Sequence, residues 1–335
     1  MDELAHALGI DPIALRIRNE PTIDPERNVP YSERRVVDCL REGARRFKWD
    51  RRQQEPGTVR DGKWLVGFGD AAAIRVHPQA PAKARVRLAP DGSCIVSSDM
   101  TDIGTGTYTV LTQIAAERLG LGVDQVRVEL GCSDLPASWG SGGSWGASSS
   151  GMAVYLACEV LREKLQATAR ADSNSRLYAQ ANAQIQFSGD RMVAGPASQA
   201  ISDLLARNHP DGLEAEGEAT PMFNDPNFAS NSIHTYGAHF AEVGVDADTG
   251  EVRLRRMLGV FSAGRILNAK TARSQMIGGM TFGVGMALLE EAVVRLRCRI
   301  GSVRHDVRCE CTQAAQTSRD AVEIQVHDRR RKQRH

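Results

Sequence analysis

Long apolar runs, paired cysteines and an excess of charge of one sign are all missing from this chain of 335 residues. No apolar segment reaches the length that crosses a bilayer, so we expect no membrane contact. The formal net charge is only +1, which gives no overall field to attract nucleic acid. The opening residues, Met1 to Leu4, lack the basic and apolar stretches of a signal peptide. A cytoplasmic location is therefore the default expectation.

Metal ligands are not grouped in the sequence either. The seven cysteines are scattered without the paired spacing of a metal site. The histidines show no metal-ligand spacing on any predicted helix. His234 and His239 are separated by an odd step, which places them on opposite faces of a strand. We therefore expect no metal to be bound directly by protein side chains.

Aromatic residues are also scarce, at 5% of the chain, whereas glycine occurs 31 times. This composition favours packed layers of helices and strands joined by many tight turns. Apolar residues alternate in several short segments and recur at helical spacing in others, which predicts an α+β fold. We expect mixed sheets with helices packed on one side, arranged in two similar halves.

The order of these patterns divides the chain into four predicted segments. They are a helical lead-in and linker (1–62), a first half with two Gly/Ser loops (63–208), a second α+β half (209–294) and a basic tail (295–335). The tail is rich in arginine and has no sustained apolar period, so we predict that it is irregular and disordered. Its abrupt start indicates translation in another reading frame. Its basic run fits a solvated surface better than a nucleic-acid site.

A glycine-rich turn organises the first half. It lies between a predicted strand (93–98) and a predicted helix (107–119), where unpaired N–H groups and the helix dipole favour an anion. The candidate residues for a phosphate or pyrophosphate site are Gly104, Thr105, Gly106 and Thr107. The neighbouring Asp99 and Asp102 fit a turn or cap better than a catalytic pair of carboxylates.

A second loop, rich in glycine and serine, spans residues 138–151 and precedes a predicted helix that starts at Ala153. Its candidate residues are Gly142, Gly143 and Ser144. Two such loops, each opening a helix, suit one extended polyanionic ligand. Each loop alone is also typical of an ordinary tight turn, and neither fits the P-loop or the full dinucleotide-binding fingerprint.

Four patterns then follow one another in a characteristic order. They are residues 102–109 with Gln113, the Gly/Ser loop before residues 151–154, the strand 236–243, and Asn268 with 275–279 and 283–290. Together they resemble the molybdenum-binding subunit of the xanthine dehydrogenase and aldehyde oxidase family. The residues of these motifs are most similar to those of the bacterial three-subunit aldehyde oxidoreductases. The resemblance runs in register from Met1 to about Val294.

The resemblance implies a cofactor that suits two anion-binding loops. This is the molybdenum–molybdopterin cytosine dinucleotide, which is long and carries a pyrophosphate. In the family both loops contact it, which supports the seven loop candidates. Gln275 matches a family glutamine that approaches the pterin. On position alone, an ordinary buried polar residue of a helix is the better interpretation of Gln275.

The family also implies a reaction and partners. A small aldehyde or heterocycle is hydroxylated with oxygen from water, and electrons leave through an iron–sulfur subunit to a subunit with FAD. Related complexes can be exported by a partner's signal, so a periplasmic location stays open. The family base is a glutamate in a Gly-x-Gly-Glu motif, and no such motif follows Val294. We assign no catalytic role to Glu290, Glu291 or Glu310, and no other catalytic residue.

These observations predict a partial molybdopterin-binding subunit of a molybdenum hydroxylase that is inactive alone. The alternative is a non-catalytic remnant, or a module that binds a nucleotide or another anion. The family's large N-terminal half and its C-terminal region do not occur in this sequence. We expect the apolar surface that they cover in relatives to make the isolated chain aggregate.

Overall fold

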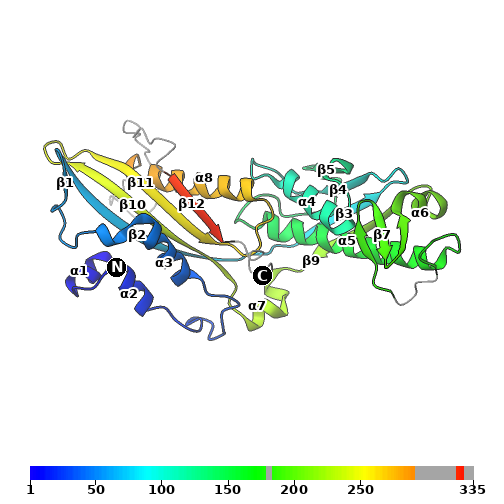
Figure 1. The fold of residues 1–335 in the computed structure, drawn as a ribbon, viewed down its shortest axis with the longest axis horizontal. Helices are drawn as coiled ribbons and strands as arrows, with labels where there is room; N and C mark the ends of the chain where they lie inside the picture. Colours follow the sequence, from blue (N-terminus) through cyan, green and yellow to red (C-terminus); the bar gives the residue numbers. More distant parts are fainter. Residues whose placement is uncertain (179–182, 291–321, 328–335) are drawn as a thin grey trace, which may run out of the picture. The chain divides into compact units, whose positions relative to one another are not determined.

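The computed structural model describes residues 1–178, 183–290 and 322–327, the last of these as backbone only. The described chain forms two compact units (Figure 1). Unit 1 combines Met1–Val76 with the described residues from Ser232 onward, and unit 2 is His77–Asn231. None of the described helices is both long and apolar enough to span a membrane.

Unit 1 is built on one long sheet. Its elements are α1 (Asp2–Ala7), α2 (Pro12–Arg18), α3 (Val36–Phe47), η1 (Trp49–Arg51), β1 (Arg60–Asp61), β2 (Trp64–Val76), β10 (His234–Asp246), β11 (Val252–Ser262), α8 (Ala269–Leu288) and β12 (Val322–His327). The strand order is β1-β2-β10-β11-β12, and only the last pair is parallel. β2 and β10 pair along their whole length, so the first and last parts of the chain share one sheet (Figure 1).

Alternation along the central strands decides which helix covers which face of this sheet. Phe240 of β10 packs against Phe47 of α3, with ring centroids 5.6 Å apart. Gly259 of β11 belongs to the opposite face, where a β-carbon would lie 2.9 Å from the sulfur of Met280 in α8. Unit 1 therefore carries helices on both faces, and the predicted one-sided cover is wrong here. Both faces of the central strands carry small or apolar residues, so both require cover.

Unit 2 contains two smaller sheets. Its elements are β3 (Ala82–Leu88), β4 (Cys94–Ser98), α4 (Thr107–Leu119), η2 (Val123–Gln125), β5 (Val126–Leu130), α5 (Gly146–Ala171), β6 (Gln186–Ser188), β7 (Arg191–Ala194), β8 (Ala197–Ala200), α6 (Ile201–Asn208), β9 (Leu213–Ala219), η3 (Met222–Asn224) and α7 (Pro226–Ser230). One sheet is mixed, with the order β5-β4-β3-β9, and the other is the antiparallel sheet β6-β7-β8.

Helices α4 and α5 enclose the core of unit 2 against the mixed sheet (Figure 1). The contact between α5 and β9 is made through small residues. Gly217 has no room for a side chain because the backbone of α5 at Ala153 and Ala157 lies directly on it. This close packing fixes the position of α5, and with it the loop that precedes the helix.

Several local predictions are confirmed. The first loop opens α4, which ends at Gly120 in the left-handed conformation with φ of 70°. The lead-in consists of short helices, and α2 is capped by the side chain of Asp11. The α+β class with three sheets and packed helices is confirmed as well.

The larger divisions differ from the predicted ones. Residues 209–231 belong to unit 2, whereas β10 and β11 join the lead-in, because β10 pairs with the distant β2. Residues 295–321 and 328–335 of the predicted tail lie outside the described residues. Within the tail, Val322–His327 forms β12, parallel to β11. The prediction of an irregular tail is wrong for this segment, where apolar and polar residues alternate as in a strand.

Candidate functional site

The two predicted loops of unit 2 are joined to each other. The backbone N–H of Ser141 donates to Oγ1 of Thr101 at 3.1 Å, and Oγ of Ser141 donates to the carbonyl of Thr101 at 2.5 Å. Thr101 directly precedes the turn at residues 102–107, and Ser141 lies in the second loop. The structure thus brings together the two segments that carry seven of the eight predicted site residues.

The sheet explains why the loops meet at this place. The second loop runs along the end of the sheet, where Lys83 N–H donates to the carbonyl of Ala137 and Asp99 N–H donates to that of Pro136, each at 2.8 Å. Farther along the loop, the hydroxyls of Ser138 and Ser150 are 3.0 Å apart. The loop is therefore anchored at both of its ends.

Asp102 determines the form of the first loop. Its Oδ1 accepts from the N–H groups of Gly104 at 2.8 Å and Thr105 at 2.9 Å, and its Oδ2 accepts from that of Tyr108 at 3.4 Å. Burial alone would raise the pKa of Asp102, but these donors outweigh it and lower the pKa. Asp102 therefore stabilises the turn before α4, in line with the turn or cap role that the sequence indicates. Two N–H groups predicted to hold a phosphate are already bonded to a carboxylate of the chain.

Other donors in the first loop are hydroxyls. Oγ1 of Thr105 and Oγ1 of Thr107 lie 3.0 Å apart. Thr107 is buried and opens α4, while Thr105 is half-buried. Gly104 and Gly106 both have positive φ, which explains the choice of glycine at these two positions. The first loop can thus offer hydroxyl groups to a ligand more readily than free backbone N–H groups.

The second loop is shorter than predicted, because α5 begins at Gly146 rather than at Ala153. Tertiary contacts override the low helix propensity of its serine run: Ser149 is buried and its Oγ accepts from the N–H of Ala80 at 2.9 Å. The N-cap residue of α5 is Trp145, which makes no side-chain cap. Of the two helix N-termini, α5 is therefore the one without a carboxylate, and it is better suited to an external anion.

Trp145 shapes the second loop, and its importance was missed by sequence reasoning. Its indole N–H donates to the carbonyl of Gly140 at 3.2 Å, and its ring lies edge-on to Trp139 at 5.8 Å. A β-carbon on Gly143 would clash with the ring, and one on Gly142 would come within 3.2 Å of it. Glycine is thus required at position 143 by the indole, whether or not a ligand is present, and a side chain at position 142 would be in tight contact with it. A tryptophan two residues after Gly-Gly was the available signal.

Gln275 belongs to a different part of the molecule. It lies on α8 in unit 1 and is exposed, so the interpretation as a buried polar residue is wrong. The seven loop residues, in contrast, all belong to unit 2. Glu290 is exposed as well, and Glu291 and Glu310 lie outside the described residues.

No metal centre is formed by side chains in the described ranges. No group of three or more His, Cys, Asp or Glu residues there could hold a metal ion. Burial lowers the pKa of His77 and His239, which favours neutral rings. Burial also raises the pKa of the Cys39 and Cys94 thiols to about 12, so they are unreactive at neutral pH.

Comparisons with known proteins agree on one family. The family model of the molybdopterin cofactor-binding domain matches residues 42–303. The aldehyde oxidoreductase molybdenum-binding subunit PaoC of Escherichia coli O157:H7 is 46% identical over 295 residues, covering 88% of this chain and 38% of PaoC. The putative xanthine dehydrogenase molybdenum-binding subunit XdhA of Escherichia coli K12 is 30% identical over 312 residues, covering 88% and 40%.

A solved structure shares the fold. Quinoline 2-oxidoreductase from Pseudomonas putida 86 matches with a TM-score of 0.78 at 20% identity, covering 98% of this chain and 43% of that one. The chain spans about two fifths of the length of the curated relatives that it matches. Because the family model covers most of its residues, the chain belongs to the molybdopterin cofactor-binding domain family found in the molybdenum-binding subunits of xanthine dehydrogenases and aldehyde oxidoreductases.

Proposed function

We propose that this chain forms the molybdopterin-binding part of a molybdenum-dependent aldehyde oxidoreductase. The observation that carries the proposal is the pair of hydrogen bonds between Thr101 and Ser141, which joins two loops at one place. An aldehyde is favoured over a heterocycle as substrate, since the identity to PaoC is 46% and that to XdhA is 30%.

The ligand that we propose is molybdopterin cytosine dinucleotide. The N-terminus of α5, which has no carboxylate cap, suits the pyrophosphate, with Ser144 as a hydroxyl donor. Thr105 and Thr107 supply hydroxyls to the polar parts of the ligand, and Gln275 supplies an amide to the pterin. When bound, the cofactor supplies oxidation of the substrate with oxygen taken from water.

The residues of this chain hold and orient the ligand rather than react. Asp102 keeps its carboxylate bonded to backbone N–H groups and has a lowered pKa, so it is a poor proton acceptor. Trp145 fixes the path of the second loop through its contacts with Gly140 and Gly143. We propose that the chain alone does not turn over aldehydes. In the complex that we propose, electrons leave the cofactor through an iron–sulfur subunit and then an FAD subunit.

The test is nucleotide and metal analysis of the chain produced in cells that make the cytosine dinucleotide cofactor. We expect molybdenum and CMP, released by acid, in a ratio of one to one. Ser144→Ala should lower both at least fivefold, whereas Ser93→Ala, in an exposed turn of unit 2, should not. Absence of CMP and molybdenum from the wild-type chain would overturn the proposal.

A second function is favoured by one observation. Asp102 already supplies negative charge to the N-terminus of α4, so the first loop keeps its conformation without a ligand. This fits a module that binds a simple nucleotide at α5 only. Retention of a nucleotide without molybdenum in the same analysis would support this alternative.

A further inference from the structure

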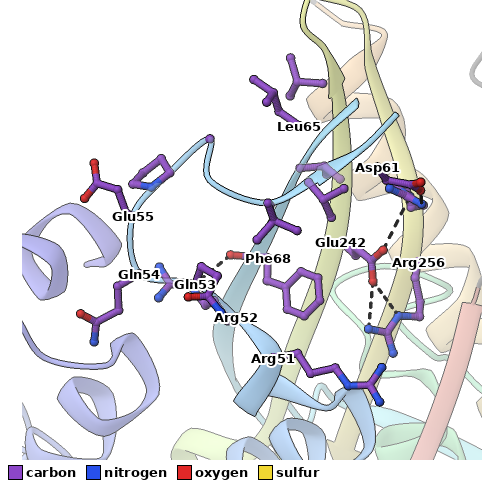
Figure 2. Close-up of a pocket in the computed structure, with 18 residues that line it drawn as sticks. Arg51, Arg52, Gln53, Gln54, Glu55, Asp61, Leu65, Phe68, Glu242 and Arg256 are labelled. Carbon is purple, nitrogen blue, oxygen red and sulfur yellow. Dashed lines mark hydrogen bonds and ion pairs between the residues drawn. The ribbon is translucent and has the colours of Figure 1, made fainter. Parts of the chain in front are cut away.

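Two clusters of charged and titratable side chains involve β10, and they differ in composition. One lines a cavity between the strands β2, β10 and β11 and the segment that follows η1. Figure 2 shows Glu242 there pointing toward Arg256, which donates to its Oε2 at 3.0 Å. Carboxylate and guanidinium groups are ordinarily both charged at neutral pH, so such a pair is not a pH sensor. The other cluster surrounds His234, the first residue of β10.

This second cluster includes the segment between α2 and α3, residues 19–35, which we call the connector. Ser232, which lies just before β10, binds the connector through both its backbone and its side chain. Its N–H donates to the carbonyl of Pro30 at 2.8 Å, and its carbonyl accepts from the N–H of Ser32 at 3.1 Å. Its hydroxyl donates to Oδ2 of Asp24. Ser232 and Asp24 are both buried, so the contact that docks the connector is shielded from solvent.

The hydrogen bonds of Ser232 fix which ring nitrogen of His234 carries a hydrogen. Nδ1 of His234 lies 3.2 Å from the Ser232 hydroxyl. The bond from Ser232 is the main cause that lowers the pKa of Asp24, which is thus a carboxylate at neutral pH and can only accept. Oγ of Ser232 therefore donates to Asp24 and accepts from Nδ1–H of His234. The other ring nitrogen, Nε2, is then the atom that gains a proton when the ring becomes charged.

The surroundings of His234 already contain a cation. The guanidinium of Arg34 lies over the rings of Tyr31 and Tyr236, 4.3 Å and 5.2 Å from their centroids. The His234 ring packs against the same two rings, at centroid distances of 6.1 Å and 6.4 Å. Burial raises the pKa of both tyrosines, so they stay uncharged. A charged His234 would thus be a second cation against two rings that already hold one.

The balance of forces on His234 favours its neutral ring while the connector is docked. Burial lowers the pKa of His234. Among the charged groups that act on the ring, Asp24 raises the pKa, whereas Arg34 and Arg27 lower it. Glu20 is bound to Arg34. A hydrated ring binds the proton more tightly than this buried one, so protonation favours the state in which the contact is open.

We propose that His234, Ser232 and Asp24 form a pH-sensitive switch that keeps the connector docked on β10 at neutral pH and releases it when the His234 ring gains a proton. The switch lies within unit 1 and uses none of the loop residues of unit 2. It is thus independent of the proposed cofactor site, and its test requires no molybdenum.

The test is hydrogen–deuterium exchange of the full chain, measured by mass spectrometry at pH 7.5 and pH 5.5. Exchange times are scaled for the intrinsic effect of pH on amide exchange. Peptides from the connector should then exchange at least threefold faster at pH 5.5, because the linked equilibrium shifts toward release. Peptides from β11, in the same unit, should not become faster. Equal scaled exchange of the connector at the two pH values would overturn the proposal.

Two variants and a matched control identify the group that responds. His234→Asn keeps an amide donor for the Ser232 hydroxyl but cannot gain a proton, so connector exchange should become equal at both pH values. Ser232→Ala removes the hydroxyl between ring and carboxylate, and should give the fast exchange at both. His209→Asn is the control, since Nε2 of His209 lies 3.1 Å from the hydroxyl of Thr168 in unit 2. It should leave the response of the connector unchanged.

Asp70 titrates in the same pH range but with the opposite sign. Burial raises its pKa to about 6, so its loss of a proton weakens unit 1 at the higher pH. Asp70→Asn should therefore leave the response of the connector at least as large as in the wild type. Circular dichroism checks that each variant is folded, and the wild-type comparison requires no variant. A response that persists in His234→Asn, or that is lost in His209→Asn, would contradict the assignment.

Discussion

Gly143 lies directly under the indole ring of Trp145, and this contact leaves no space for a side chain on the loop before α5. The φ of Gly143 is +49°, a conformation that L-residues adopt at a cost. Two independent effects therefore require glycine here. The conformation of the proposed cofactor loop therefore depends on the packing of one aromatic ring.

Replacing Gly143 should separate these two effects. We expect Gly143→Ala to destabilise the chain by roughly 3 kcal/mol, from backbone strain and overpacking together. Gly104→Ala is the control, since its φ is +95° but a β-carbon there meets nothing within 4 Å, and it should cost only about 1 kcal/mol. Urea unfolding measures both. Equal losses would show that the indole does not restrict the loop.

The link between the loops is expected to support ligand retention. Thr101→Val removes the hydroxyl that accepts from Ser141, and Ser141→Ala removes the second bond. Each should cost about 1 kcal/mol of unfolding free energy. Each should also lower the molybdenum content measured by mass spectrometry. Unchanged molybdenum in both variants would separate the link from cofactor binding.

The hydrogen bonds from backbone N–H groups to Asp102 give a pH-dependent prediction. Its pKa is lowered from 3.8 in the folded chain, so its stabilisation is complete at neutral pH and is lost as the pH falls below about 4. Asp102→Ala should cost about 1 kcal/mol at pH 7, and the difference from wild type should shrink toward pH 3. Thermal melts at several pH values measure it. The control is Asp225→Ala, which removes the cap of the short helix α7.

Asp70 should change stability with pH in the opposite direction to Asp102. Its side chain is buried on β2, and burial raises its pKa to about 6, with Arg16 opposing the rise at 3.2 Å. The folded chain therefore binds this proton more tightly than the unfolded chain. Stability from this group should decline between pH 4 and pH 6, by roughly 3 kcal/mol in total. Asp70→Asn should flatten that decline in urea unfolding, and an unchanged pH profile would contradict the assignment.

Helix α8 gives a prediction about association. Met280 is its only buried residue, while Phe282 and Met286 are 69% and 56% exposed. We expect the isolated chain to self-associate through this helix. Phe282→Ser with Met286→Ser should shift its size-exclusion profile toward the monomer. Val252→Ser, at an exposed apolar residue of β11, should not. A wild-type chain that is already monomeric would contradict the prediction.

Patterns in the sequence predicted those structural elements that interactions between neighbouring residues determine. The helix over 107–119 follows from its apolar periodicity and the glycine that ends it, and it is present. The start of α5 was missed because the burial of Ser149, far from Ala80 in sequence, stabilises a serine-rich turn of helix. The contact between Thr101 and Ser141 was not predicted, because it joins two turns and turns have no periodic pattern in the sequence. The pairing of β2 with β10 was not foreseen either, because the whole of unit 2 separates the two strands in sequence.

The pairing of Val76 with His234 makes unit 2 the loop of a β-hairpin in topological terms. Unit 2 leaves and rejoins the sheet on adjacent strands, which lie about 5 Å apart. It is an insertion, and a short turn in its place would keep every backbone pair between β2 and β10. During synthesis, one edge of β2 has no partner until all of unit 2 has left the ribosome. We expect folding of the inserted unit to protect that edge, because it brings the two ends of unit 2 together and so brings β10 to β2.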